Sequence, residues 1–336
     1  MTETPQEVLA RIASSYDTRT HYCRLELTGN GEGALRLAGA VLNRPMLAAV
    51  VEQLMAALPS QAINVDAVRI LDAGATRAAV GVNLTGLYAQ PSWLAEQLSQ
   101  LLNGWPLEVL FEEGKWRFVR QSDGYLGWAY GPYLSEPAGC AFTHVVGRPE
   151  VTLLAEPAAD AAPVTRIPGG TAVTVDASEL VWRHVTLAGG LTGWLPAPAL
   201  RAFPALPEGE APRRGQMMLD AAMFVGVPYL WGGCSAWGID CSGFAQLLHR
   251  LVGITLPRDA DMQFAAGKPV EYPYQPGDLL FFSETRDPNH ITHVAVSRGG
   301  WDIIHSSRRI NGVYEDNVET VPDLRDSFIA GRTFLK

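Results

Sequence analysis

The chain has 336 residues, of which 47% are hydrophobic and 18% charged, and its formal net charge is -9. A composition this apolar can bury hydrophobic cores, which argues against wholesale disorder. An acidic chain gains nothing from counterion release on DNA or RNA, so we expect no nucleic-acid partner. No segment approaches the roughly 18–20 uninterrupted apolar residues of a transmembrane helix, so we expect no membrane partner either.

The cysteines are too few for a disulfide framework, and their spacing does not fit a zinc ribbon. They are Cys23, Cys140, Cys234 and Cys241, and none forms a Cys-x-x-Cys pair. We therefore expect free thiols, no metal and no cofactor. The first residues contain no basic stretch followed by an apolar one, so no signal peptide is indicated. We expect a cytoplasmic protein, and an exported form stays open if a leader is missing from the sequence.

Residues 1–76 read as a small α+β unit. Apolar residues at helical spacing alternate with strand-like segments bounded by glycine and polar residues. The predicted elements are a helix at Val8–Ser14, strands at Tyr22–Leu27 and Leu35–Leu42, a helix at Pro45–Leu58 and a strand at Ala62–Leu71. The unit shows no chemical motif, so its role stays open between an additional cap, a partner-binding surface and a dimer contact.

Residues 77–140 and 141–203 are predicted to be all-β, and they repeat one pattern. Each has a Trp-x-x-Val strand, a glycine turn, a Gly-Trp step and a closing leucine. The pattern falls on Trp116, Val119, Gly127, Trp128 and Leu134, and again on Trp182, Val185, Gly193, Trp194 and Leu200. A repeat of about 60 residues favours tandem small barrels. It resembles bacterial SH3-like domains, in which the Gly-Trp step closes a hairpin.

Residues 204–213 read as a proline-rich charged linker, and residues 214–336 as a further domain. This domain opens with helix patterns at Arg214–Val225 and at about Asp240–Val252. Strand patterns follow near Pro276, His293 and Trp301. Helices followed by strands indicate an α+β domain with an antiparallel sheet.

Cys241 lies where a glycine-rich loop is predicted to meet a helix. Backbone N–H groups and the helix dipole at such a start favour an anion, so we expect the thiol pKa to be lowered. The same N–H groups can hold an oxyanion. His293 heads an apolar strand and is the expected base. His305 follows on the next strand, and in a hairpin it would orient His293.

The stretch from Tyr229 to Gln263 resembles the NlpC/P60 peptidase family, and so do two downstream segments. The matching motifs are Tyr229, Trp231-Gly-Gly, Asp240-Cys-Ser-Gly-Phe, Gly253-Ile, Leu256-Pro-Arg-Asp, Gln263, Pro276-Gly-Asp-Leu-Leu-Phe-Phe and His293-Val-Ala-Val. The resemblance implies a papain-like α+β fold. It also implies a Cys–His–His triad of Cys241, His293 and His305.

Two SH3-like domains before such a domain resemble the γ-D-glutamyl-L-diamino acid endopeptidases that process muropeptides. The resemblance implies a muropeptide substrate with a free N-terminal L-Ala, and a cleft closed by the first SH3-like domain. Asp240 and Ser242 would recognise the amine, and a substrate ammonium would neutralise Asp240. Trp231 and Tyr229 would belong to the pocket, with Tyr125 as the wall residue. Ala260 replaces the usual hydroxyl residue after Leu-Pro-Arg-Asp, which puts one substrate contact in doubt.

Four functions compete on these residues. The first is a muropeptide-recycling endopeptidase, and the second is an exported hydrolase of intact peptidoglycan with SH3-like anchors. An amidase or acyltransferase would use the same acyl-enzyme chemistry. A binding protein with a dead site would require the loss of Cys241 or His293, and both are present. Diaminopimelate and Lys remain open at the third substrate position, and protein partners and oligomeric state are not predicted.

Overall fold

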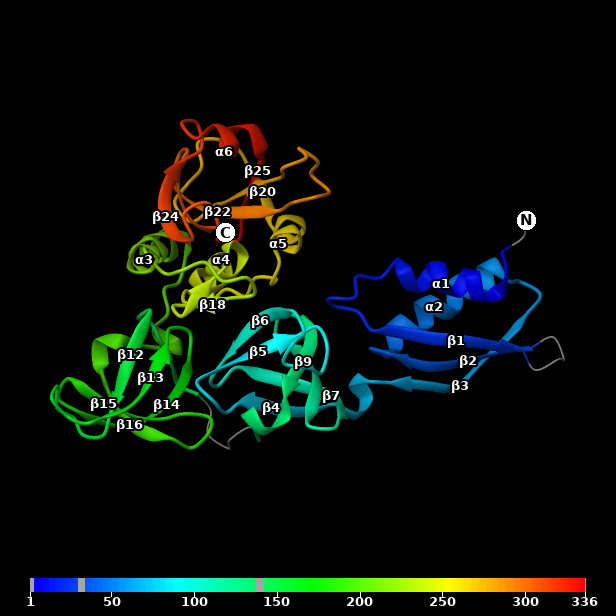
Figure 1. Cartoon of the computed structure of the whole chain (residues 1–336), viewed down its shortest axis with the longest axis horizontal. Helices are drawn as coiled ribbons and strands as arrows, with labels where there is room; N and C mark the ends of the chain where they lie inside the picture. The colour runs from blue at the N-terminus through cyan, green and yellow to red at the C-terminus, as the bar shows by residue number, and fades with distance from the viewer. Residues whose placement is uncertain (1–2, 30–33, 137–141, 336) are drawn as a thin grey trace.

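The computed structural model describes residues 3–29, 34–136 and 142–335. The N-terminal unit lies at one end of the molecule, two β-rich regions follow, and the C-terminal domain lies above both of them (Figure 1). The predicted boundary between residues 140 and 141, and Cys140 with it, falls outside the described residues. Among the described residues, no helix is long and apolar enough to cross a membrane.

The N-terminal unit contains the two helices and three strands expected from the sequence. They are α1 (Pro5–Ser14), β1 (Cys23–Gly29), β2 (Ala34–Val41), α2 (Arg44–Ala57) and β3 (Ala62–Ile70). Thr4 caps α1 in a capping box with Glu7, and Asn43 caps α2 through its side chain. Strand β2 pairs antiparallel with β1 and parallel with β3, with α2 as the crossover.

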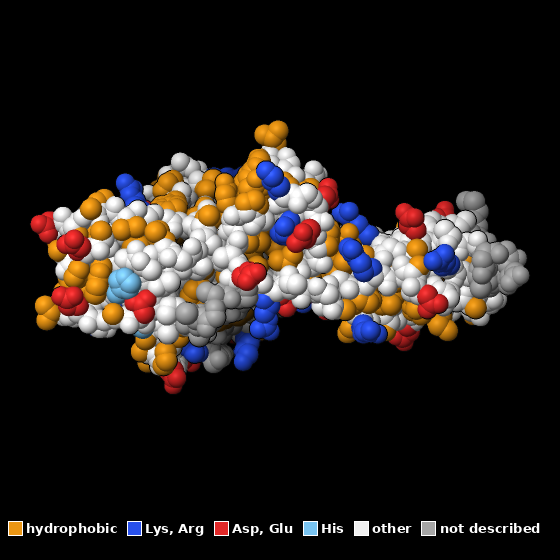
Figure 2. Space-filling model, turned by 90° about the horizontal axis from the view of Figure 1, so that it is seen from below, with side chains coloured by type: hydrophobic (Ala, Val, Ile, Leu, Met, Phe, Trp, Pro, Cys, Tyr) orange, Lys and Arg blue, Asp and Glu red, His pale blue; other side chains and the backbone are white. Residues whose placement is uncertain are grey.

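An apolar contact fixes the N-terminal unit on the next region. Met46 and Leu71 from the unit share one buried cluster with Trp116, Phe118 and Trp128. Seen from below, the unit forms a lobe that projects from the rest of the molecule, with side chains of both charges interspersed over this face (Figure 2). The apolar contact explains why the lobe keeps one orientation despite its projection.

The first β-rich region is a seven-stranded sheet in the order β10-β4-β7-β8-β9-β5-β6. Its strands are β4 (Thr76–Val80), β5 (Leu84–Tyr88), β6 (Gln97–Leu102), β7 (Pro106–Glu113), β8 (Trp116–Gln121), β9 (Leu126–Tyr130) and β10 (Leu134–Ser135). The described pairing does not close into a ring, so the expected barrel closure is not observed. Edge strand β6 contacts β18 of the C-terminal domain instead, which covers the edge that closure would have removed.

The second β-rich region repeats the first, strand for strand, in the order β13-β12-β16-β15-β14-β11-β17. Its strands are β11 (His144–Val146), β12 (Glu150–Leu154), β13 (Pro163–Pro168), β14 (Ala172–Glu179), β15 (Trp182–Thr186), β16 (Thr192–Pro196) and β17 (Leu200–Ala202). This pairing is also open among the described residues. The repeat read from the sequence is therefore present as a repeat of strand order.

The Gly-Trp steps have the same structural cause in both sheets. Gly127 pairs with Val119, and Gly193 pairs with Val185. A Cβ on Gly127 would lie 2.6 Å from Leu87 Cγ, and one on Gly193 would lie 2.7 Å from Leu153 Cγ. In each sheet a buried leucine fills the space that a larger residue would need.

The C-terminal domain begins earlier than expected. Helix α3 spans Glu210–Met223, so the last four residues of the predicted linker 204–213 belong to the helix. Pro212 contributed to the prediction of a linker, because proline usually interrupts a helix. In the first turn, however, proline removes only an N–H that has no helical partner, so the helix tolerates it there. A short 3-10 turn, Phe203–Ala205, precedes the helix.

The remaining elements form an antiparallel sheet packed against helices, as predicted. They are β18 (Cys234–Ser235), β19 (Gly238–Ile239), α4 (Cys241–Arg250), α5 (Ala260–Ala266), β20 (Lys268–Val270), β21 (Leu279–Phe282), β22 (His293–Gly299), β23 (Asp302–Ser307), β24 (Gly312–Asn317), α6 (Pro322–Ser327) and β25 (Phe328–Thr333). The sheet order is β20-β25-β21-β22-β23-β24. Helix α4 packs on β22 and β23 around Phe244, Leu248, Val294 and Ile304, which brings the start of α4 beside these strands.

Candidate active site

Cys241 is the first residue of α4, and the glycine-rich loop fixes its position. The Asp240 carboxylate caps the helix and accepts the N–H of Gly243 at 2.7 Å. A Cβ on Gly243 would collide with the carbonyl oxygen of Gly233. The loop backbone therefore lies directly against the first helical turn. Cys241 lines a cleft of about 1100 Å³.

His293 and His305 lie side by side on the hairpin of β22 and β23, as predicted. His293 Nε2 is 2.8 Å from His305 Nδ1, and the two ring planes meet at 69°. One of these nitrogens carries the proton that joins them. The hydrogen bond fixes the plane of the His293 ring, and His293, His305 and Cys241 all line the same cleft.

Asp316 extends this pair, and the sequence analysis missed it. Its Oδ2 lies 3.5 Å from His305 Nε2. Tyr314, two residues earlier on β24, pairs with His305 across the strands and contacts its ring at 4.7 Å between centroids. Side chains two apart on a strand share a face, so strand alternation was the available signal. The row His293, His305 and Asp316 places a carboxylate behind the second imidazole.

The protonation of the pair differs from the sequence expectation. Burial, reinforced by the neighbouring Asp240 carboxylate, raises the pKa of Cys241 to about 12. Burial lowers the pKa of His293 to about 4 and that of His305 further still. The expectation that a helix start would lower the thiol pKa is therefore wrong. Burial and Asp240 outweigh the backbone N–H groups of Val294 and Ser242, which favour the thiolate. Both shifts favour the neutral forms, a thiol on Cys241 and an uncharged imidazole on His293.

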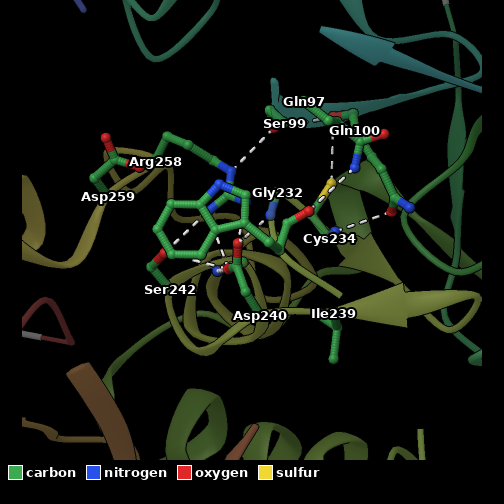
Figure 3. Close-up of polar contacts among 12 residues, drawn as sticks. Gln97, Ser99, Gln100, Gly232, Cys234, Ile239, Asp240, Ser242, Arg258 and Asp259 are labelled. Carbon is green, nitrogen blue, oxygen red and sulfur yellow. Dashed lines mark hydrogen bonds and ion pairs between the residues drawn. The ribbon is translucent and has the colours of Figure 1, made fainter. Parts of the chain in front are cut away.

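Asp240 already has a positive partner, which corrects a second expectation. Arg258 Nη2 lies 2.6 Å from Asp240 Oδ2, and both groups are buried (Figure 3). The same carboxylate accepts the N–H of Gly232 at 2.9 Å. A substrate ammonium is therefore not needed to neutralise Asp240. Arg258 belongs to the Leu-Pro-Arg-Asp motif, but its pairing with Asp240 could not be read from either segment alone.

Ser242 belongs to the same buried network. It donates to Asp240 Oδ1 at 3.3 Å and accepts from Arg258 Nη1 at 2.9 Å. Arg258 Nε also donates to Ser99 Oγ at 3.0 Å, on β6 of the first sheet (Figure 3). The network thus locks the helix start to the first β-rich region, and the Ser242 hydroxyl is already engaged within it.

Tyr125 reaches the cleft, and it is buried rather than an exposed turn residue. Its hydroxyl donates to Asp259 Oδ2 at 2.8 Å. Arg19, from the N-terminal unit, donates to the same oxygen at 2.9 Å and forms an ion pair with Asp261. Asp17 binds the other side of the Arg19 guanidinium. Three carboxylates thus share one guanidinium, so this end of the cleft keeps an excess of negative charge.

Trp231 and Tyr229 lie in the cleft wall formed by the glycine-rich loop. Trp231 Nε1 donates to Glu96 Oε1 of the first β-rich region at 2.8 Å. The Arg308 guanidinium lies over both rings, 5.4 Å from the centroid of Tyr229 and 5.2 Å from that of Trp231. Trp231 remains half exposed, so its face is available to a bound molecule.

Cys234, the second cysteine of the loop, has a different environment. It is buried against the first sheet, where its N–H donates to Gln100 Oε1 at 3.0 Å. Burial raises the pKa of Cys234 to about 11. Within the described residues, no group of three or more His, Cys, Asp or Glu side chains is arranged to hold a metal ion.

Comparison with known proteins identifies two parts of the chain. Residues 226–328 match the NlpC/P60 family, and residues 81–136 match the bacterial SH3 domain. The chain is 28% identical to the gamma-D-glutamyl-L-lysine dipeptidyl-peptidase of Bacillus cereus over 239 residues, which is 67% of this chain and 70% of that protein. It is 29% identical to the dipeptidyl-peptidase 6 of Lysinibacillus sphaericus over 254 residues, which is 70% of this chain and 89% of that protein.

The fold agrees with these matches. The crystal structure of an NlpC/P60 family protein from Bacillus cereus superposes with a TM-score of 0.69 at 23% sequence identity. The match covers 78% of this chain and 100% of that one. The domain matches show that the chain contains an NlpC/P60 domain with a bacterial SH3 domain ahead of it.

Proposed function

We propose that the chain is a cysteine peptidase that cleaves the bond between γ-D-Glu and the diamino acid in cell-wall peptides with a free N-terminal L-Ala. One observation carries this proposal. The cleft that holds Cys241 and the two histidines is also lined by Tyr125 and Arg19, which bind Asp259 and Asp261. We propose that Tyr125 and Arg19 close the cleft there, so that its carboxylates bind a peptide that stops with an ammonium group.

The chemistry begins from the neutral pair. Cys241 Sγ attacks the γ-carbonyl carbon of D-Glu while His293 accepts the thiol proton. Backbone N–H groups at the start of α4 stabilise the oxyanion of the tetrahedral intermediate. His293 then gives its proton to the departing amine of the diamino acid. Water, activated by the same imidazole, releases L-Ala-γ-D-Glu from the sulfur.

His305 and Asp316 act on His293 rather than on substrate. The hydrogen bond between the imidazoles holds one tautomer and one ring plane throughout the proton transfers. Asp316, behind His305, would stabilise positive charge that moves onto the histidine pair when Cys241 loses its proton. In this proposal Cys241 and His293 are the catalytic residues and His305 is a positioning residue.

The amine-recognition role belongs to Asp259 and Asp261 rather than to Asp240. Asp240 is buried and paired with Arg258, whereas Asp259 and Asp261 are partly exposed to the cleft and share Arg19 with Asp17. An ammonium ion gains most where carboxylates lack a full set of cations. The names of the two relatives support peptides of the γ-D-glutamyl class and release of a dipeptide.

The alternative is an exported hydrolase of intact peptidoglycan, with the two β-rich regions as SH3-like wall anchors. A cleft that Tyr125 and Arg19 close would oppose this function, because the stem peptides of intact wall are attached through their L-Ala. Recycling of free peptides, which we propose to take place in the cytoplasm, needs no such attachment.

A cleavage assay tests the proposal. We expect release of L-Ala-γ-D-Glu from L-Ala-γ-D-Glu-meso-diaminopimelate or from its L-Lys counterpart, with sacculi left intact. Cys241→Ala should lower kcat/KM by at least about 10³-fold without unfolding the chain. Solubilised sacculi with a poor tripeptide rate would favour the anchored hydrolase. If Cys241→Ala kept the wild-type turnover, the proposed mechanism with Cys241 as nucleophile would be wrong.

A further inference from the structure

The loop between α1 and β1 reaches out of the N-terminal unit to the start of α5 (Figure 1). Arg19, in this loop, is locked before any substrate arrives. The Asp17 carboxylate accepts both the backbone N–H of Arg19 at 2.9 Å and its Nε at 3.0 Å. The Arg19 carbonyl accepts the N–H of Leu126 at 2.7 Å, directly beside Tyr125. The loop is thus anchored on the first sheet at the wall residue itself.

Three parts of the molecule meet at Asp259. Tyr125 of the first sheet and Arg19 of the N-terminal unit both donate to its Oδ2. Arg19 also holds both oxygens of Asp261. Asp259 lines the cleft, and its Oδ1 receives no hydrogen bond from any described residue, so this oxygen is free to bind a ligand.

A peptide ammonium on Asp259 Oδ1 would have Arg19 and Tyr125 as its next neighbours. A chain that continued past its first residue would have to run through the space of these two side chains. The Arg19 side chain lines the cleft and is 33% exposed, so it contacts both the cleft and solvent. Its ion pairs with Asp259, which precedes α5, and with Asp261 in the first turn of α5 oppose its displacement.

We propose that the N-terminal unit is part of the substrate site and that Arg19 is a specificity-determining residue, which ends the pocket after the first substrate residue and excludes longer peptides. The inference rests on the proposed function and goes beyond it, because it assigns the length limit to a residue outside both matched domains. The apolar docking of the unit on the first sheet keeps the loop in place.

The test measures substrate length. The two probes are L-Ala-γ-D-Glu-meso-diaminopimelate and the same peptide with one glycine added before L-Ala. We expect the wild-type chain to cleave the tripeptide and to discriminate strongly against the extended peptide. Arg19→Ala should raise the ratio of kcat/KM for the extended peptide to that for the tripeptide by at least about 10-fold, the scale of a pocket that loses a steric limit.

The matched control is Arg11→Ala, in the same unit. Arg11 forms an exposed ion pair with Glu3 and does not line the cleft, so this variant should keep the wild-type ratio. Thermal unfolding establishes that each variant is folded. If Arg19→Ala does not fold, the ratio is measured on Arg19→Lys instead. Lysine keeps a positive charge for Asp259 and Asp261 but lacks the broad guanidinium.

The outcomes separate the two proposals. Tripeptide cleavage together with a wild-type ratio in folded Arg19 variants would overturn the role of Arg19 and leave the proposed function standing. Equal wild-type rates on both peptides would do the same. A wild-type chain inactive on the tripeptide would overturn the proposed function, and the inference would fail with it.

Discussion

Gly124 and Gly190 occupy equivalent turns of the two seven-stranded sheets. Both have positive φ, +89° and +83°. The Gly124 N–H donates to the Gln121 carbonyl at 3.0 Å, and the Gly190 N–H donates to the Leu187 carbonyl at 2.9 Å. The two turns thus share one backbone conformation and one hydrogen bond, and both favour glycine because φ is positive.

The next residue separates the two turns. Tyr125 is buried and donates to Asp259 in the cleft, whereas Leu191 is 42% exposed. The second sheet packs on the C-terminal domain elsewhere, through the ion pair of Arg201 with Asp220 on α3. The same strand order therefore forms a cleft wall in the first sheet and a supporting contact in the second. The residue after the turn glycine, Tyr125 or Leu191, makes this difference.

Replacing the two turn residues should give the largest difference. Tyr125→Ala should lower kcat/KM on the free tripeptide by about 10²-fold, since it removes a buried ring from the wall and a donor from Asp259. Leu191→Ala should stay within about 2-fold of wild type, because surface substitutions rarely propagate. Steady-state kinetics on purified variants measures both. Equal losses in the two variants would mean that the turns act on activity only through the fold.

The supporting contact of the second sheet should appear in stability rather than in specificity. Arg201→Ala leaves the buried Asp220 carboxylate without its cation, and we expect a loss of about 3 kcal/mol. Arg166→Ala, which removes an exposed partner 3.7 Å from Glu150, should change stability by less than about 1 kcal/mol. Urea unfolding followed by tryptophan fluorescence makes the comparison. A wild-type midpoint for Arg201→Ala would show that this ion pair does not hold the second sheet on the C-terminal domain.

The two Gly-Trp steps should respond alike. Gly127→Ala and Gly193→Ala should each lower stability by about 1–3 kcal/mol, because the new methyl group meets a buried leucine. The loss should be larger for Gly193, where the Leu154 carbonyl oxygen also lies 2.7 Å from the added Cβ and a backbone atom cannot rotate away. Urea midpoints again provide the measurement, and a neutral effect in either sheet would break the equivalence of the two copies.

The sequence was informative where one local pattern determines the geometry. The helix start at Cys241 and the strand order around His293 and His305 follow from motif spacing, and the repeat follows from the two Gly-Trp steps. The pairings of Asp240 with Arg258 and of Arg19 with Asp261 were not predictable, because they depend on how separate segments dock. The predicted direction of the thiol pKa shift was wrong for the same reason, because the burial of Cys241 comes from the whole cleft rather than from the helix start.

The Cys241 thiol lies at the start of α4 rather than in a turn of either sheet. A neutral resting thiol with a pKa near 12 should react with iodoacetamide through its thiolate, whose fraction rises about 10-fold per pH unit below the pKa. Inactivation should therefore accelerate steadily from pH 6 to 9 without a plateau, and it is followed as loss of activity. Tyr125→Ala and Leu191→Ala should show the same slope, since neither side chain sets the charge on Cys241. A plateau from about pH 6 upwards would mean that the resting enzyme holds a thiolate–imidazolium pair, in which case burial in the cleft opposes charge less than the geometry indicates.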